Sequence, residues 1–200
     1  MARRGTPFFW DDERCNLPDQ PVVGVSWYEA MAYCAWLHQQ CIIHGQGLTL
    51  ASEPLATLLS TGHWQVRLPT DAEWEKAAGW DTDTQQKRRY AWGDTWDASK
   101  ANADGQVGYP CAVGVFPAGT AACGALDMTG NVWEWTLSQY AEYPYKPDAR
   151  NDAAGEAHRV LRGGAWNFNA RFARVSYRYF AHPADFVSFV GVRVVVAPGL

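Results

Sequence analysis

The nine residues from Asp127 to Trp135, DMTGNVWEW, combine two acids, two tryptophans and a Gly-Asn turn. The carboxylates of Asp127 and Glu134, with carbonyl oxygens of the turn between them, are ligands that a hard cation such as Ca²⁺ prefers. The same residues fit a hairpin that is anchored by its tryptophans and leaves its acids in solvent. The spacing alone therefore leaves a calcium site and a structural hairpin equally open.

Two other groups of polar residues invite a chemical interpretation. In the stretch from Ala101 to Gly105, Asn and Asp beside Gly are typical of a tight turn, and oxygen ligation of calcium is the sharper alternative. Glu73 and Glu75 resemble a pair of catalytic acids. Because residues two apart on a helix point to different faces, we expect these two glutamates to have structural roles.

The cysteines and histidines do not show the spacing of a metal site. An odd number of cysteines without a CxxC pair favours free thiols, most of them small core residues, over a zinc site. The cysteines are Cys15, Cys34, Cys41, Cys111 and Cys123. We expect the histidines at 38, 44 and 63 to be surface or capped residues.

Two helices with recognisable starts must position these groups. The first is predicted to begin after Ser26, with Glu29 completing a capping box, and to run to about Gln40. The second is predicted to begin after Thr70 and to end at Gly79. Each helix has a tryptophan, Trp27 or Trp74, on the face that is expected to pack in the core.

The rest of the chain indicates a fold rich in loops. A short helix is predicted near residues 53–59, turns dominate residues 80–126, and residues 138–158 are predicted to form a long exposed loop. The Gly163-Gly164 pair predicts a tight turn or a close backbone approach. The β-branched run 191–196 predicts one buried strand.

Composition limits the possible functions. The chain has 200 residues, 11 tryptophans, 18 glycines and a net charge of −4. This length suits one domain, and the acidic balance argues against general nucleic-acid binding. The sequence has no apolar run of membrane-spanning length and no apolar signal region at the N-terminus. We therefore expect a cytoplasmic protein that binds neither nucleic acid nor membrane.

Five motifs together resemble the formylglycine-generating-enzyme (sulfatase-modifying factor) domain family. They are VSWYEA at 25–30, RLPTDAEWE at 67–75, GNVWEW at 130–135, RVLRGG at 159–164 and GVR at 191–193. The resemblance covers roughly residues 8–196. It implies an α+β fold of the irregular C-type lectin kind, with two helices and short antiparallel strands, formed by residues 1–200 as a single domain. Family members usually have more chain before Pro21, so we expect this domain to be the C-terminal part of a longer protein.

The resemblance also implies calcium as a structural cofactor. The family's cation site uses an acid or amide side chain, two turn carbonyls and the Glu of GNVWEW. These positions correspond to Asp127, Gly130, Val132 and Glu134. A second family site would start at residues 102–103, although its other ligands are not recognisable in this sequence.

The family's catalytic cysteines have no counterpart here. Aligned from the Gly-Gly turn, their positions fall at about Phe168 and Ala173, and no cysteine follows Cys123. Thiolates act as nucleophiles and soft-metal ligands, so the sequence predicts no enzyme activity of the formylglycine-forming kind. Another family branch performs iron-dependent oxygen chemistry with a histidine-rich partner domain. A rival prediction is therefore an oxidoreductase that uses other metal ligands, for which His182 with Asp185 is the nearest pair.

The segment from Trp166 to Arg193 resembles the variable region of variable proteins from diversity-generating retroelements. In those systems, adenines of a template copy are rewritten, and the usual Asn codons cannot become Lys, Glu, Gln, Met or Trp. None of these five residue types occurs among the 29 residues from Asn167 to Val195. These five residue types together make up roughly a fifth of ordinary sequence, so their absence from 29 consecutive residues is unusual.

The sequence therefore predicts a non-catalytic binding protein with a hypervariable, aromatic-rich surface. Aromatic residues give a large contact area at low entropic cost, as in antibody paratopes. The surface favours a protein ligand over a sugar. A domain with a fixed ligand in a regulatory protein is the remaining alternative. The predicted contact residues are Phe168, Asn169, Phe172, Tyr177, Tyr179, Phe180, Ala181, His182, Phe186, Val187, Ser188 and Phe189.

Overall fold

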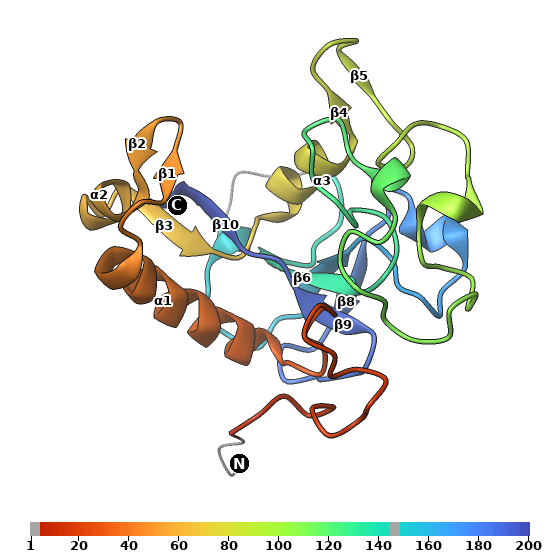
Figure 1. The fold of residues 1–200 in the computed structure, drawn as a ribbon, viewed down its shortest axis with the longest axis horizontal. Helices are drawn as coiled ribbons and strands as arrows, with labels where there is room; N and C mark the ends of the chain where they lie inside the picture. The colour runs from red at the N-terminus through yellow and green to blue at the C-terminus, as the bar shows by residue number, and fades with distance from the viewer. Residues whose placement is uncertain (1–4, 145–148) are drawn as a thin grey trace.

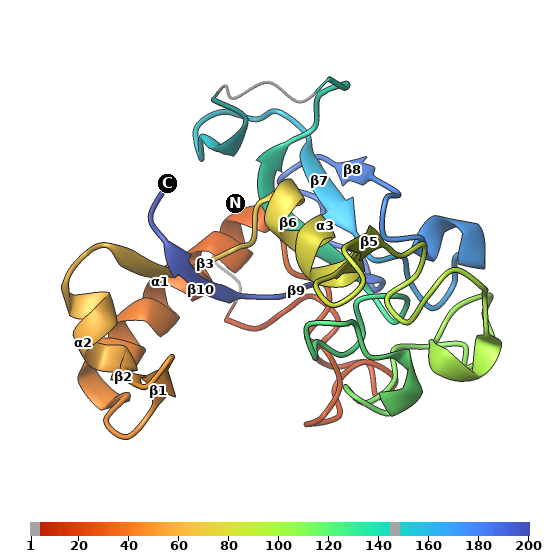
Figure 2. The ribbon, with the colours of Figure 1, turned by 90° about the horizontal axis from the view of Figure 1, so that it is seen from above.

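A computed structural model describes residues 5–144 and 149–200 (Figure 1). It has an irregular α+β fold with few helices and short, mostly antiparallel strands, as the sequence predicts. The helices α1 (Trp27–His44) and α2 (Leu55–Ser60) lie on one side of a central sheet, together with the paired strands β3 (Trp64–Arg67) and β10 (Val195–Pro198) (Figures 1 and 2). The long irregular segment after β5 (Gln86–Lys87) lies on the other side. None of the helices in the described part of the chain is long and apolar enough to cross a membrane.

The helix α1 (Trp27–His44) begins as its sequence predicts. The Ser26 side chain accepts from the Glu29 backbone N–H, and the Glu29 carboxylate accepts from the Ser26 backbone N–H at 2.7 Å. The helix buries Trp27, Ala30 and Cys34 and continues one turn beyond the predicted end at Gln40. The prediction ended too early because no glycine or proline interrupts the chain before Gly45, where α1 stops.

Two further helices agree with their predictions. The helix α3 (Asp71–Gly79) has a complete capping box between Thr70 and Glu73. The helix α2 is short and spans Leu55–Ser60. Segment 80–126 contains only the β4–β5 hairpin and two short 3₁₀ turns, in agreement with its turn-rich sequence. The bounds are β4 Trp80–Asp81, β5 Gln86–Lys87, η1 Ala98–Lys100 and η2 Pro117–Gly119.

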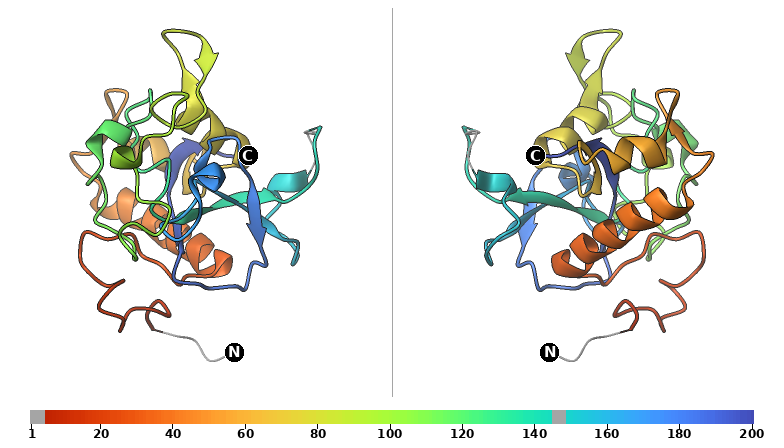
Figure 3. Two further views of the ribbon diagram at one scale, coloured as in Figure 1. Left: turned by 90° about the vertical axis from the view of Figure 1, so that its right-hand side faces the viewer. Right: turned by 90° about the vertical axis from the view of Figure 1, so that its left-hand side faces the viewer.

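The central sheet has the strand order β8-β7-β6-β9. Its strands are β6 (Trp133–Gln139), β7 (Arg159–Arg162), β8 (Tyr179–Ala181) and β9 (Val190–Val192). The outer ends of β6 and β7 extend away from the body of the domain (Figure 3). Both β6 and β9 carry motifs of the sequence analysis, and their parallel pairing sets Glu134 beside Gly191.

Two sequence predictions about strands and loops are wrong. The run 191–196 is divided between β9 and β10 (Val195–Pro198), and β10 pairs with β3 (Trp64–Arg67) in a separate sheet. Valines stand on both sides of the break between β9 and β10, and only Arg193 interrupts them, so the pattern does not reveal the break. Residues 138–158 are not one exposed loop, since they include the end of β6, η3 (Ala149–Asn151) and the buried Arg150. Residues 145–148 of this loop lie outside the described residues.

The main core is built on tryptophans. Trp27, Trp133 and Trp135 are at most 2% exposed and pack with Leu68 and Leu161 into one cluster. Buried indole nitrogens donate to backbone carbonyls: Trp27 Nε1 to Thr136 at 2.9 Å and Trp135 Nε1 to Val25 at 3.0 Å. These long-range bonds tie α1 to β6, where short strands provide few ladder bonds. One further two-stranded sheet pairs β1 (Thr49–Leu50) with β2 (Glu53–Pro54).

The Gly163-Gly164 turn is a close backbone approach, as predicted. Gly164 has φ +80°, and a Cβ added there would lie 2.8 Å from Cα and Cβ of Ala173. We expect Gly164→Ala to lower the free energy of unfolding by about 2–4 kcal/mol, because it combines a strained φ with an overpacked contact. Gly155 provides the matched control, since it has φ +82° and no heavy atom within 4 Å of an added Cβ. In chemical denaturation, Gly155→Ala should lose only the free energy that corresponds to the strained φ, about 1 kcal/mol. Equal losses of unfolding free energy in the two variants would show that the contact with Ala173 adds nothing.

Candidate functional site

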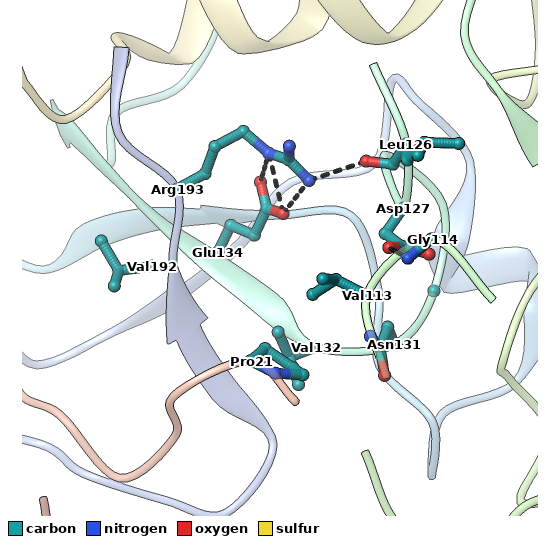
Figure 4. Close-up of a pocket in the computed structure, with 11 residues that line it drawn as sticks. Pro21, Val113, Gly114, Leu126, Asp127, Asn131, Val132, Glu134, Val192 and Arg193 are labelled. Atoms are coloured by element: carbon teal, nitrogen blue, oxygen red, sulfur yellow. Dashed lines mark hydrogen bonds and ion pairs between the residues drawn. The ribbon is translucent and has the colours of Figure 1, made fainter. Parts of the chain in front are cut away.

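A cavity of 310 Å³ brings the four predicted calcium ligands together, and Asp127, Gly130, Val132 and Glu134 all line it (Figure 4). They come from the end of the irregular segment and the start of β6. The turn between them is fixed by neighbouring backbone. The Gly130 N–H donates to Gly163 O at 2.8 Å and the Asn131 N–H to Asn102 O at 2.8 Å. The structure therefore brings these four residues together at one cavity.

The Glu134 carboxylate, which lines this cavity, already accepts hydrogen bonds from one cationic and one neutral side chain. The Arg193 guanidinium donates from Nη2 to Oε1 at 2.6 Å and from Nε to Oε2 at 2.8 Å. Trp74 Nε1 donates to Oε2 at 2.6 Å. Arg193 Nη2 also donates to Leu126 O at 2.9 Å, and both residues line the cavity. Arg193 therefore holds both a carboxylate and a backbone carbonyl, and its pairing with Glu134 was not predicted from the sequence.

Asp127 is the member of this set with spare ligand capacity. It has φ +57°, and its Oδ2 accepts from the Gly114 N–H at 2.6 Å. Burial raises the pKa of its carboxyl above the ordinary value near 3.8, against the lowering effects of the Gly114 N–H and Arg193, and the nearby Glu134 raises it further. A desolvated carboxylate beside turn carbonyls suits a hard cation. In this set Glu134 is held by Arg193, and Asp127 is the carboxylate that forms no ion pair with a described residue.

A second feature is the aromatic surface, defined as Phe168, Phe172, Tyr177, Tyr179, Phe180 and Phe189. The buried Trp133 forms its floor and stacks on Tyr179, with ring centroids 5.3 Å apart. Phe168 contacts the rings of Phe172, Tyr179 and Phe189 at 5.3–6.0 Å. These contacts join side chains from η4 (Ala170–Ala173), β8 and the loop before β9 into one continuous surface.

The aromatic surface extends beyond the segment 166–193. The Phe180 ring contacts Tyr140 at 4.5 Å and His158 at 5.2 Å, which lie at the ends of β6 and β7. Sequence reasoning missed both residues. Their only signal was position, next to strands whose pairing with β8 is a long-range property.

The twelve predicted contact residues share one property, since none of them is buried. Asn169, Tyr179 and Phe180 are exposed, and the others are half-buried. Phe186 lies apart from the aromatic surface and packs on Phe8 of the N-terminal arm at 4.8 Å. The interspersed Ala170, Ala173, Val175 and Val190 are buried. The segment therefore combines buried scaffold positions with surface positions.

His182 and Asp185, the pair considered for a metal, form a local turn instead. The His182 N–H donates to the Asp185 carboxylate at 3.1 Å, and His182 Nδ1 accepts from the Ala184 N–H at 3.2 Å. Among residues 5–144 and 149–200, no group of three or more His, Cys, Asp or Glu side chains is arranged to hold a metal ion. The five cysteines are free thiols, as predicted, but only Cys15 and Cys34 are buried, so the prediction that most of them are core residues is wrong.

Buried arginines hold the irregular backbone beneath the aromatic surface. Arg162 is fully buried, pairs with Asp71 at 2.6 Å and with Glu75, and donates to the carbonyls of Val175 (3.0 Å) and Tyr177 (2.8 Å). Arg178 pairs with the other oxygen of Asp71 at 2.7 Å and donates to Ala141 O at 2.8 Å. The structural role predicted for Glu75 is therefore correct. Glu73 is structural too, because Arg67 holds the pKa of its carboxyl at about 2.

Comparisons with known proteins agree on a family. Residues 6–198 match the sulfatase-modifying factor enzyme 1-like domain. Proteins named hercynine oxygenase from Mycolicibacterium thermoresistibile and Mycobacterium tuberculosis are each 38% identical over 187 residues, 88% of this chain. The chain spans 36% of the length of each. Treponema denticola variable protein 1 has the same fold, with a TM-score of 0.66, 24% identity and coverage of 96% of this chain and 75% of that one.

These relatives correct one prediction. The missing cysteines led to the expectation that the protein has no enzyme activity, but the two relatives at 38% identity carry the name of an enzyme. The loss of one catalytic group excludes only the chemistry that needs it, and the relatives point to enzyme function in the family. The chain belongs to the family of the sulfatase-modifying factor enzyme 1-like domain.

Proposed function

We propose that this protein binds a protein ligand through residues 166–193, as a variable protein of a diversity-generating retroelement. One observation carries the proposal: all twelve predicted contact residues reach the surface, whereas the buried residues between them are alanines, a valine and a proline. The inward-pointing Arg178 is held in place by its ion pair with Asp71. Such a division allows the contact residues to change while the backbone stays fixed. Half-exposed aromatic rings on a rigid floor supply apolar contact area with little loss of side-chain entropy.

The experiment is to sequence the DNA that adjoins the gene. The proposal predicts a near-copy of the codons for residues 166–193 that differs from the gene only where the copy has adenine. The differing codons should include those of the twelve contact residues and should spare those of the buried Ala173 and Val175. If this region is identical in every isolate and no such copy exists, the variable-protein proposal fails, and a fixed ligand replaces it.

A second candidate function follows from the relatives named hercynine oxygenase. In this alternative, the domain forms the substrate-binding part of an oxidoreductase, and the aromatic surface holds a substrate. The test is oxygen uptake by the full-length protein with hercynine, together with the redox-metal content of the purified protein. Substrate-dependent uptake that falls when Tyr179 is replaced by alanine would support this function; uptake equal to the rate without hercynine would exclude hercynine as the substrate.

We also propose that calcium binds at Asp127 with the carbonyls of Gly130 and Val132, as a structural cofactor. Support comes from the cavity that these residues share and from the desolvated Asp127 carboxyl. The ion would neutralise a carboxylate that burial disfavours, and would brace the turn before β6. Its role would be stability rather than direct contact with the ligand.

The pH dependence of stability tests the calcium proposal. Because the folded-state pKa of Asp127 is raised, the folded protein binds the proton more tightly, so stability falls as the pH rises above about 3.8. In a chelator, Asp127→Asn should therefore become more stable relative to the wild type as the pH rises through this window.

Adding calcium at neutral pH should raise the melting temperature of the wild type only. An equal rise in both proteins, or none, would contradict a calcium site at Asp127.

A further inference from the structure

The arginines around the aromatic surface fall into two groups. Arg162, Arg178 and Arg193 each pair with a carboxylate at 2.7 Å or less. Arg171 and Arg174 form no ion pair with any described carboxylate, although both belong to the same segment. The segment therefore places two uncompensated positive charges on a protein with a net charge of −4.

The two arginines are held at the edge of the aromatic surface by η4. The Arg171 guanidinium lies over the Phe172 ring, 4.6 Å from its centroid. Arg174 Nε donates to Arg171 O at 2.8 Å, which keeps the second guanidinium beside the first residue. Phe172 in turn contacts Phe168 and Tyr177. Residues 170–173, in blue at the right of Figures 1 and 2, lie at the end of the domain remote from α2.

The nearby carboxylates do not neutralise these guanidiniums. Asp104 Oδ1 accepts from the Ala170 N–H at 3.0 Å, and among the described residues it forms no ion pair with Arg171 or Arg174. Asp185 lies after β8, where it binds the His182 N–H. The edge formed by η4 is therefore positive beside an apolar face.

We propose that the ligand is a protein that presents carboxylates beside apolar side chains, with Arg171 and Arg174 receiving the carboxylates. This inference rests on the proposed function and specifies its partner. Guanidiniums bind carboxylates in a planar, bidentate geometry, and arginine with aromatic residues is the composition typical of binding hot spots. The stacked Phe172 ring restricts Arg171 before binding, which lowers the entropic cost of using it.

Selection from a random peptide library displayed on phage tests this inference. Wild type and Arg171→Gln/Arg174→Gln are the targets, with Arg14→Gln/Lys76→Gln as a control that also loses two positive charges, both outside the segment. We expect peptides enriched on the wild type to contain Asp and Glu next to apolar residues, at about three times their frequency in the naive library. One such synthetic peptide should bind Arg171→Gln/Arg174→Gln about tenfold more weakly and the control variant equally well.

The outcomes separate this inference from the proposed function. Tyr179→Ala/Phe180→Ala identifies peptides that bind the aromatic surface. Peptides that lose binding to this variant but carry no excess of acids would overturn the inference and leave the proposed function in place. If no enriched peptide depends on Tyr179 or Phe180, both the inference and the proposed function fail.

Discussion

Replacing Arg162 with methionine is expected to lower the free energy of unfolding by about 3–5 kcal/mol, measured by chemical denaturation. The guanidinium is completely buried, binds two carboxylates and satisfies the carbonyls of Val175 and Tyr177. Methionine fills similar space but leaves Asp71 Oδ1 and both carbonyls without these partners. The cost is large because a buried charge or carbonyl that loses its partner cannot recover water.

Arg171→Met provides the matched control for this effect. The substitution removes the same group, but the Arg171 side chain is exposed, and among the described residues its guanidinium contacts the Phe172 ring and forms no ion pair. We expect a change within about 0.5 kcal/mol. A loss below 1 kcal/mol for Arg162→Met would contradict the view that buried arginines replace the strand pairing that this segment lacks.

Replacing Trp133 with alanine is expected to cost about 3–5 kcal/mol, because it leaves a large cavity in the core. Trp133 is 0% exposed, and its ring contacts Phe168, Tyr177 and Tyr179. The near-ultraviolet circular dichroism of the aromatic rings should also weaken in the folded variant, since the floor of the aromatic surface is removed. Comparison with a variant of an exposed ring then separates the contribution of the buried floor to stability from that of the surface.

Phe180→Ala is the control for Trp133. Its ring belongs to the aromatic surface but is 42% exposed, and it contacts Tyr140, His158 and Tyr179 at the outside. We expect a loss of about 1 kcal/mol or less. Equal losses at positions 133 and 180 would mean that the surface is itself core, and would contradict a replaceable binding surface.

Local signals in the sequence predicted the parts of the fold that depend on local contacts. The starts of α1 and α3 followed from capping boxes that span four residues, and the Gly163-Gly164 turn followed from its glycines. The pairing of Arg162 with Glu75, 87 residues apart, and of Arg193 with Glu134, 59 residues apart, could not be predicted from any local pattern. The break between β9 and β10 was missed for the same reason, since the partner of β10 is the distant β3.

The candidate sites show the same division. The four candidate ligands at 127–134 are close in sequence, so their grouping could be predicted, and the twelve surface positions all lie in one short segment. Tyr140 and His158 join the aromatic surface only because β7 pairs with both β6 and β8. The enzyme relatives corrected an inference from missing cysteines, which had excluded one reaction and not all chemistry.

The most direct test of a rigid scaffold with a replaceable surface is a mutational scan of residues 166–193, read by protease resistance of the displayed protein. The twelve contact positions should accept most residues that adenine mutation of an Asn codon can produce. The buried positions, among them Ala165, Ala173, Val175 and Val190, should reject most of the same residues. If the contact positions are as intolerant as the buried ones, the segment is a conventional core, and the account of a replaceable binding surface is wrong.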